Sequence, residues 1–232
     1  HGNQFTSKLE GMMRDIQLSK DAEKQFQTHL SETKQNIERS TPDLDDLRVL
    51  VLTMGFWPLA KSVEPSRLPE PMATAKAFFE DFYRLQSGNN NKILQFQWTQ
   101  GSCEVKATFD KTYTLKVAPL QAMILDVFNP CNDDGDCNSS GDSKKFGIPD
   151  LVNLTGLVTE ALKPMLHSLS LSRYRVLKRI PLDKSQANPK KLLDTDMFEV
   201  NTSFTCPRRV ISLPQPEIKN SRSVKEKVQE DR

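Results

Sequence analysis

Apolar residues recur at helical spacing in the first part of the chain. Two stripes lie between residues 5 and 30, and their members are Leu9, Met12, Met13 and Ile16, then Ala22, Phe26 and Leu30. Ser19 lies between the stripes, where a serine can cap the start of a new helix. The pattern therefore predicts two short amphipathic helices. Polar residues 31–46 are predicted to form a loop or a frayed helical extension.

The next pattern combines a strand with a helix. Residues 47–54 (LRVLVLTM) form an aliphatic run that ends at Gly55-Phe56-Trp57-Pro58, which predicts a buried strand closed by a turn. Three prolines between residues 62 and 71 indicate a surface connector. A helix is expected over residues 75–85, because Ala75, Phe78, Phe79, Phe82 and Leu85 share one face. We expect this helix to end near Gly88 and to cover a sheet.

The sheet is predicted from three strands with alternating character. Residues 92–100 (KILQFQWTQ) and 103–109 (CEVKATF) are separated by Gly101-Ser102, which suits a two-residue hairpin. A third strand is expected at residues 113–117, followed by helical spacing from Pro119 onwards. Because alternate residues of a strand face opposite sides, the bulky side chains should share one face. They are Leu94, Phe96 and Trp98 on one strand, and Val105, Ala107 and Phe109 on its neighbour.

A polar stretch at residues 129–145 (NPCNDDGDCNSSGDSKK) marks the strongest change of composition and predicts a domain boundary. Helical patterns follow at residues 148–154 and 160–169. Strands are expected at residues 174–180 and 197–204, on either side of a polar excursion. Two helices followed by such a hairpin are typical of a winged helix. The charged residues 217–232 are expected to form a linker helix.

Composition excludes several classes of function. The formal net charge is +2 over 232 residues, so no global field favours nucleic acid or an anionic membrane. No apolar run approaches the roughly 20 residues of a membrane span, and residues 1–13 lack the pattern of a signal peptide. The four cysteines are too sparse for a fold built on disulfides, and we expect reduced thiols.

Candidate catalytic chemistry is sparse as well. The phosphate-binding, nucleophile-elbow and zincin motifs are absent from the sequence. The three histidines are far apart, and the acidic residues between Cys131 and Cys137 fit neither a Ca²⁺ loop nor a common zinc module. We therefore expect no catalytic residues, no metal ligands, no cofactor and no enzyme activity. One rival function remains, because Arg173, Arg175, Lys178 and Arg179 form a basic cluster that could contact phosphates.

Four segments in succession are distinctive: FTSKLEGMMRDIQLSKD (5–21), LTMGFWP (52–58), ILQFQWTQGSCEVKATF (93–109) and YTLKVAPLQAMILDVFN (113–129). They resemble segments of the cullin family, and they occur in that family's order. The first two are similar to type three and type four cullins. The resemblance implies an α+β fold with four parts: the end of a helical bundle (1–40), an α/β domain with a small antiparallel sheet (41–129), a winged-helix subdomain (130–215) and a linker helix (216–232).

The same resemblance implies a scaffold function in a ubiquitin ligase complex. The α/β domain is expected to bind a RING-box protein, whose N-terminal strand extends the sheet by β-augmentation. The expected contact residues are Trp57, Leu94, Phe96, Trp98, Val105, Ala107 and Phe109. A ubiquitin-conjugating enzyme would bind indirectly, and substrate adaptors would bind an N-terminal half that precedes this chain. The lysine that accepts the family's ubiquitin-like modifier is expected outside the chain, and the expected location is the cytoplasm and nucleus. The alternative is a winged-helix protein that binds nucleic acid.

Overall fold

The structure is a computed structural model, and it describes residues 2–36, 44–59, 63–86, 92–129, 144–182 and 191–216. The chain divides into two compact units, one comprising residues 1–61 and 69–94, the other residues 62–68 and 95–232. The polar stretch at residues 129–145 and the predicted linker helix lie mostly outside the described residues. The domain boundaries expected near residues 40, 129 and 215 stay a prediction.

A single helix, α1 (Gly2–Asn36), opens the first unit. The prediction of two helices separated near Ser19 is wrong. Ser19 is fully buried, and its Oγ donates to the carbonyl of Val51 (2.7 Å) and accepts from the N–H of the same residue (3.0 Å). Because this hydroxyl bonds a distant segment and does not cap a new helix, α1 continues without a break.

The segment at residues 47–54 lies along α1 and forms no strand, so the predicted buried strand is also wrong. Its backbone is bound by side chains of α1, as in the hydrogen bond from Gln27 Nε2 to the carbonyl of Leu47 (3.3 Å). The turn that follows is confirmed, with Gly55 at a positive φ of 100°. A Cβ on Gly11 would lie 2.6 Å from the ring of Phe56, so this glycine permits the close approach of the segment.

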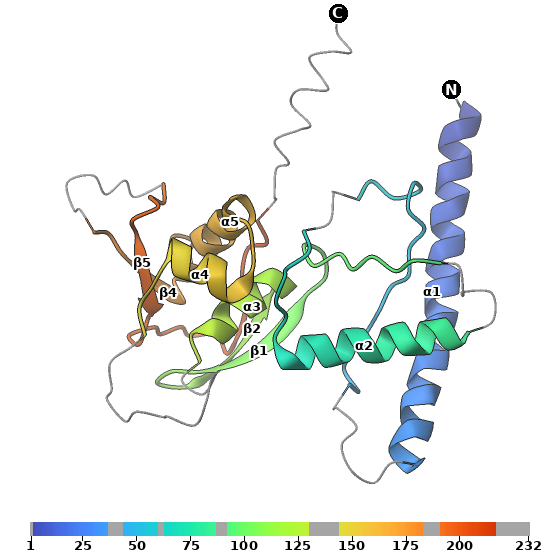
Figure 1. Cartoon of the computed structure of the whole chain (residues 1–232), viewed down its shortest axis with the longest axis horizontal. Helices are drawn as coiled ribbons and strands as arrows, with labels where there is room; N and C mark the ends of the chain where they lie inside the picture. Colours follow the sequence, from blue (N-terminus) through green and yellow to red (C-terminus); the bar gives the residue numbers. More distant parts are fainter. Residues whose placement is uncertain are drawn as a thin grey trace, which may run out of the picture. The chain divides into compact units, whose positions relative to one another are not determined.

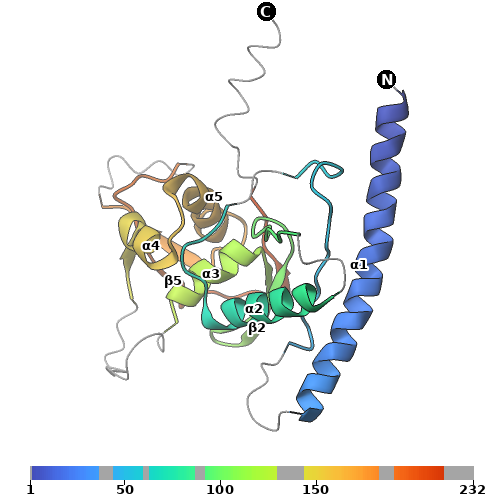
Figure 2. The ribbon, with the colours of Figure 1, turned by 45° about the vertical axis from the view of Figure 1, so that its right-hand side comes forward.

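The predicted helix over residues 75–85 is confirmed as α2 (Glu70–Leu85), which begins directly after Pro69. Its aromatic stripe packs on α1 and not on a sheet, which corrects the expectation. The ring centroids of Phe79 and Phe82 lie 5.2 and 5.1 Å from that of Phe26 in α1. Figure 1 shows α2 crossing α1, and in Figure 2 one end of α2 lies beside α1, as this contact requires.

The second unit contains the sheet that the sequence indicated, with different strands. Its order is β1 (Cys103–Thr108), β2 (Thr112–Val117) and β6 (Val210–Ser212). The strands predicted at residues 103–109 and 113–117 are confirmed, and they form an antiparallel hairpin. The strand predicted at residues 93–99 is wrong, and so is its hairpin through Gly101. β6 pairs with β2 in parallel, across almost 100 residues of sequence.

Three helices cover the hairpin and join it to a second sheet. They are α3 (Pro119–Val127), α4 (Ile148–Thr155) and α5 (Thr159–Ser170), as the helical patterns predict. The second sheet has the order β3 (Phe146–Gly147), β5 (Met197–Val200) and β4 (Leu177–Ile180). Figure 1 shows the three helices gathered above the β1–β2 hairpin. The described residues thus form five helices and two small sheets, and the predicted α+β class is confirmed.

Two buried polar contacts tie this unit together. Gln121 in α3 accepts from the N–H of Ala118 (2.8 Å) and donates to Ser168 Oγ in α5 and to the carbonyl of Pro214 (2.9 Å). In the second sheet, Arg179 Nε lies 2.7 Å from Asp196 Oδ2, and both side chains are almost fully buried. A buried charge is tolerated only when it is paired, so loss of either side chain would leave an uncompensated charge between β4 and the segment before β5.

Candidate partner-binding surface

β1 is an edge strand, because among the described residues only β2 pairs with it. The contacts of β2 show which backbone groups of β1 point outward. Thr114 N–H donates to the carbonyl of Arg209 (2.8 Å), and the carbonyl of Lys116 accepts from Leu213 N–H (2.9 Å), so both residues direct their backbone toward β6. The residues between them direct theirs toward β1, since neighbouring residues of a strand point to opposite sides.

The register of the hairpin completes this derivation. Val105 lies opposite Leu115 and Ala107 opposite Tyr113, so these pairs exchange the ladder hydrogen bonds. The N–H and C=O groups of Glu104, Lys106 and Thr108 therefore point away from the sheet. We call these outward groups the free edge of β1. They can bind an added strand without any change in the hairpin.

The two faces of β1 differ in polarity. Cys103, Val105 and Ala107 are half-buried on the face that they share with buried β2 side chains. On the opposite face Glu104 Oε1 lies 3.0 Å from Lys116 Nζ in an exposed ion pair. An added strand could pack its own apolar side chains against this face and so extend the core. Burial raises the pKa of the Cys103 thiol, which keeps it protonated near neutral pH.

The predicted aromatic pair before β1 is brought together even though its strand is absent. The rings of Phe96 and Trp98 stack with centroids 5.5 Å apart, and Trp98 is buried. Leu94, at the end of the first unit, is half-buried, while Ile93 is 96% exposed. The predicted alternation of faces is thus present in an extended segment that forms no ladder.

Phe109 follows β1 and belongs to a separate aromatic cluster. Its ring centroid lies 5.2 Å from that of Phe204 and 6.1 Å from that of Tyr113. The Tyr113 hydroxyl accepts a hydrogen bond from the N–H of Cys206 (3.2 Å). This cluster joins the hairpin to the segment between β5 and β6.

Trp57, also predicted as a contact residue, lies in the first unit and hydrogen-bonds to a buried carboxylate. Its indole Nε1 donates to Asp15 Oδ2 (2.8 Å), which also accepts from Thr53 N–H (2.7 Å), while Thr53 Oγ1 donates to Oδ1 (2.8 Å). Burial opposes ionisation of Asp15, but these hydrogen bonds, with the charge of Arg14, outweigh it and lower the pKa of the carboxyl. Sequence reasoning missed Asp15, because one acidic residue in an amphipathic helix gives no distinguishing signal.

The turn before β1 contains buried polar atoms that lack, among the described residues, partners of the kind that Asp15 provides for Trp57. Gln97 Oε1, Trp98 Nε1 and Thr99 Oγ1 are all buried, and within the described part of the chain none has a hydrogen-bond partner. The turn is closed by the hydrogen bond from Gln100 N–H to the carbonyl of Gln97 (2.9 Å). The sequence predicts Trp98 as a contact residue from its place on the bulky face of an expected strand and from the family resemblance, and neither indicates that the indole N–H is unsatisfied.

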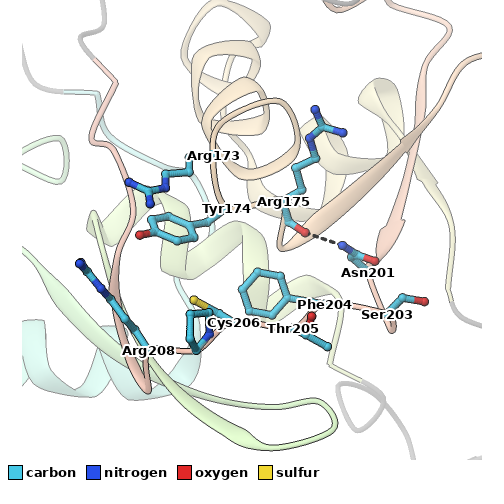
Figure 3. Close-up of a pocket in the computed structure, with 10 residues that line it drawn as sticks. Arg173, Tyr174, Arg175, Asn201, Ser203, Phe204, Thr205, Cys206 and Arg208 are labelled. Carbon is cyan, nitrogen blue, oxygen red and sulfur yellow. Dashed lines mark hydrogen bonds between the residues drawn. The ribbon is translucent and has the colours of Figure 1, made fainter.

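A basic pocket of about 390 Å³ lies between the end of α5 and the segment after β5. Three arginines line it, Arg173, Arg175 and Arg208, and the guanidinium of Arg173 lies 5.4 Å from the ring centroid of Tyr174. In Figure 3 the Arg175 side chain extends away from the other two arginines, and its carbonyl accepts a hydrogen bond from Asn201 (2.7 Å). The basic cluster predicted from sequence is divided, because Arg179 is paired with Asp196 in the second sheet.

The described residues contain free thiols but neither a metal site nor a helix that could cross a membrane. No group of three His, Cys, Asp or Glu side chains is arranged to hold a metal ion. None of the helices there has the length and apolar character needed to cross a membrane. Cys103 and Cys206 are free thiols, while the other two cysteines lie outside the described ranges.

Comparison with known proteins gives a consistent result. The profile of the "Cullin alpha+beta domain" family matches residues 51–204. Over the whole chain, the sequence is 31% identical to Cullin-1 of Oryza sativa subsp. japonica and 32% identical to Cullin-2 of Arabidopsis thaliana, and in each case the match covers 28% of the relative. Cullin-4A of Homo sapiens is 33% identical over 88% of the chain and 23% of its own length. The chain thus spans about a quarter of the length of these relatives.

Proposed function

The chain belongs to the cullin family, and from this membership we propose that it is part of the scaffold of a ubiquitin ligase complex. In this proposal a RING-box protein docks on the second unit and brings a ubiquitin-conjugating enzyme, while substrate adaptors bind elsewhere on the longer scaffold. The complex would act in the cytoplasm and nucleus. Membership of the family favours this function over the nucleic-acid alternative, and the divided basic cluster agrees with that choice.

The chain itself is proposed to carry out no chemical step. Ubiquitin transfer through a thioester needs a nucleophilic thiolate, and burial raises the pKa of Cys103 and so disfavours the thiolate. Family membership supports the same assignment, in which the chemistry belongs to the bound partners. We also propose that residues 130–215 form the family's winged-helix subdomain, which the order β3, α4, α5, β4, β5 supports.

One observation carries the docking proposal, namely that the free edge of β1 lies within the residues that match the family profile. An added strand would hydrogen-bond to the backbone of Glu104, Lys106 and Thr108. Its apolar side chains would continue the face formed by Val105 and Ala107. Docking of this kind takes affinity from main-chain hydrogen bonds and specificity from alternate side chains.

A proline at position 106 tests this docking mode directly. The Lys106 N–H points outward, so Lys106→Pro removes one hydrogen-bond donor from the free edge and leaves the β1–β2 ladder intact. We expect Lys106→Pro to weaken binding of a purified RING-box protein by at least tenfold, as measured by calorimetry, with little change in melting temperature.

Lys106→Ala is the matched control, because it removes the same side chain and keeps the N–H. We expect it to bind within about twofold of the unmodified chain. Equal loss of affinity in both variants would assign the effect to the side chain and reject docking at this edge. Unchanged binding by Lys106→Pro would reject it as well.

A further inference from the structure

The turn before β1 combines three buried polar atoms that lack partners within the described residues: Gln97 Oε1, Trp98 Nε1 and Thr99 Oγ1. Trp98 is only 9% exposed. Buried polar groups in native proteins are almost always hydrogen-bonded, and an unmade bond at such a group destabilises the fold. Three exceptions on consecutive residues single out this turn as a candidate for a partner from outside the described residues.

The other tryptophan shows what a completed site looks like. The indole of Trp57 donates to Asp15 at 2.8 Å, and the same carboxylate binds Thr53. The chain therefore supplies an internal acceptor for one indole and none, among the described residues, for the other.

The position of the turn indicates what the missing partner is. It leads directly into β1, whose free edge begins at Glu104. The turn ends at Gln100, three residues before Cys103, so a strand that followed the free edge past Glu104 would run toward it. An extended backbone presents C=O and N–H groups alternately, which matches one indole donor, one amide acceptor and one hydroxyl that can do either.

We propose, on the basis of the docking mode inferred above, that the backbone of the docked strand supplies these partners. Trp98 Nε1 donates to a carbonyl oxygen of the docked strand, and Gln97 Oε1 and Thr99 Oγ1 bind its N–H groups. The three atoms are covered by the chain itself in the free state, so docking shifts the turn. One backbone hydrogen bond, between Gln100 and Gln97, closes this turn, and a second contact joins Gln215 Nε2 to the carbonyl of Gly101 (2.9 Å). Trp98 is thus a partner-recognition residue through its N–H as well as its ring.

Trp98→Phe separates these two roles, because it keeps an aromatic ring and removes the donor. Titration of a purified RING-box protein should show about a tenfold weaker Kd for Trp98→Phe. The melting temperature of the free variant should stay equal or rise by a few degrees, since an unsatisfied buried donor is removed.

Thr99→Val should also weaken binding. Its matched control is Thr202→Val, the same change at an exposed position, which should bind normally.

The chain has two tryptophans, so a ¹⁵N spectrum contains two indole signals, which Trp98→Phe assigns. The RING-box protein should move the Trp98 signal downfield and slow its exchange with water. If the unmodified chain binds but Trp98→Phe binds equally well and the Trp98 signal does not change, this inference is rejected and the docking mode remains. A clear drop in the melting temperature of Trp98→Phe would also reject it. If the unmodified chain does not bind, the proposed function is rejected, and this inference with it.

Discussion

Residues 47–57 and residues 92–102 are two extended segments, each with a tryptophan and a glycine turn near its end. The polar groups of the first segment have partners on α1, where Asp15, Ser19 and Gln27 bind its backbone and its indole. The second segment keeps three buried polar atoms without partners among the described residues. The first segment is completed within the chain, and we propose that another protein completes the second. Among the described residues the two segments thus differ in whether the chain itself satisfies their buried polar groups.

If internal partners give the fold its stability, the free energy of unfolding should fall most when a buried charged group loses its partner. Asp196→Ala leaves Arg179 without the carboxylate that lies 2.7 Å from its Nε in a buried site. We expect the free energy of unfolding to fall by about 3–5 kcal/mol, as measured by denaturant melts.

The second ion pair of the same region provides the control. Asp194 lies 2.7 Å from Lys163 Nζ, but its side chain is 72% exposed. Asp194→Ala should lower the free energy of unfolding by less than about 1 kcal/mol. Similar losses in Asp194→Ala and Asp196→Ala would show that burial of the partner is not what determines the effect.

A smaller loss in the free energy of unfolding is expected at Asp15, which binds polar groups of residues 47–57. Asp15→Ala removes the acceptor for the N–H of Thr53 and for the indole of Trp57, so both donors become unsatisfied. We expect the free energy of unfolding to fall by about 2–4 kcal/mol in thermal and denaturant melts. A neutral Asp15→Ala would contradict the assignment of this segment as internally completed.

The effect of Asp15 should also depend on pH. Burial acts to raise the pKa of this carboxyl, but hydrogen bonds from Thr53 and Trp57 hold it below the ordinary value of 3.8. Because the pKa is lower in the folded state, Asp15 stabilises the fold above about pH 4, and that contribution is lost as pH falls through the folded pKa. The stability difference between the unmodified chain and Asp15→Asn should therefore shrink as pH is lowered below about 4.

Much of the fold could be predicted from sequence because its signals are local. The helical spacing of α2, α3, α4 and α5 and the alternation in β1 and β2 each depend on a few neighbouring residues. The errors concern partners that are distant in sequence. Residues 47–54 have a strand-like composition, but their backbone is bound by side chains of α1. The pairing of β6 with β2 joins residues almost 100 positions apart, which no local pattern reveals.

The candidate site was predictable to a similar extent. Alternation correctly placed Phe96 and Trp98 on one face, because the side chains of any extended segment alternate whether or not a ladder forms. It could not indicate that Trp57 binds Asp15, since that contact depends on how the segment folds back on α1. The outward direction of the Lys106 N–H also required the observed register.

Amide hydrogen exchange provides the most direct test of docking at the free edge of β1. The rates would be measured by NMR on the chain alone and with a RING-box protein bound. We predict that the amides of Glu104, Lys106 and Thr108 become protected in the complex, whereas those of Val105 and Ala107, already paired with β2, change little. Unchanged exchange at the three outward amides of a chain that binds the RING-box protein, or new protection confined to β6, would contradict docking at this edge.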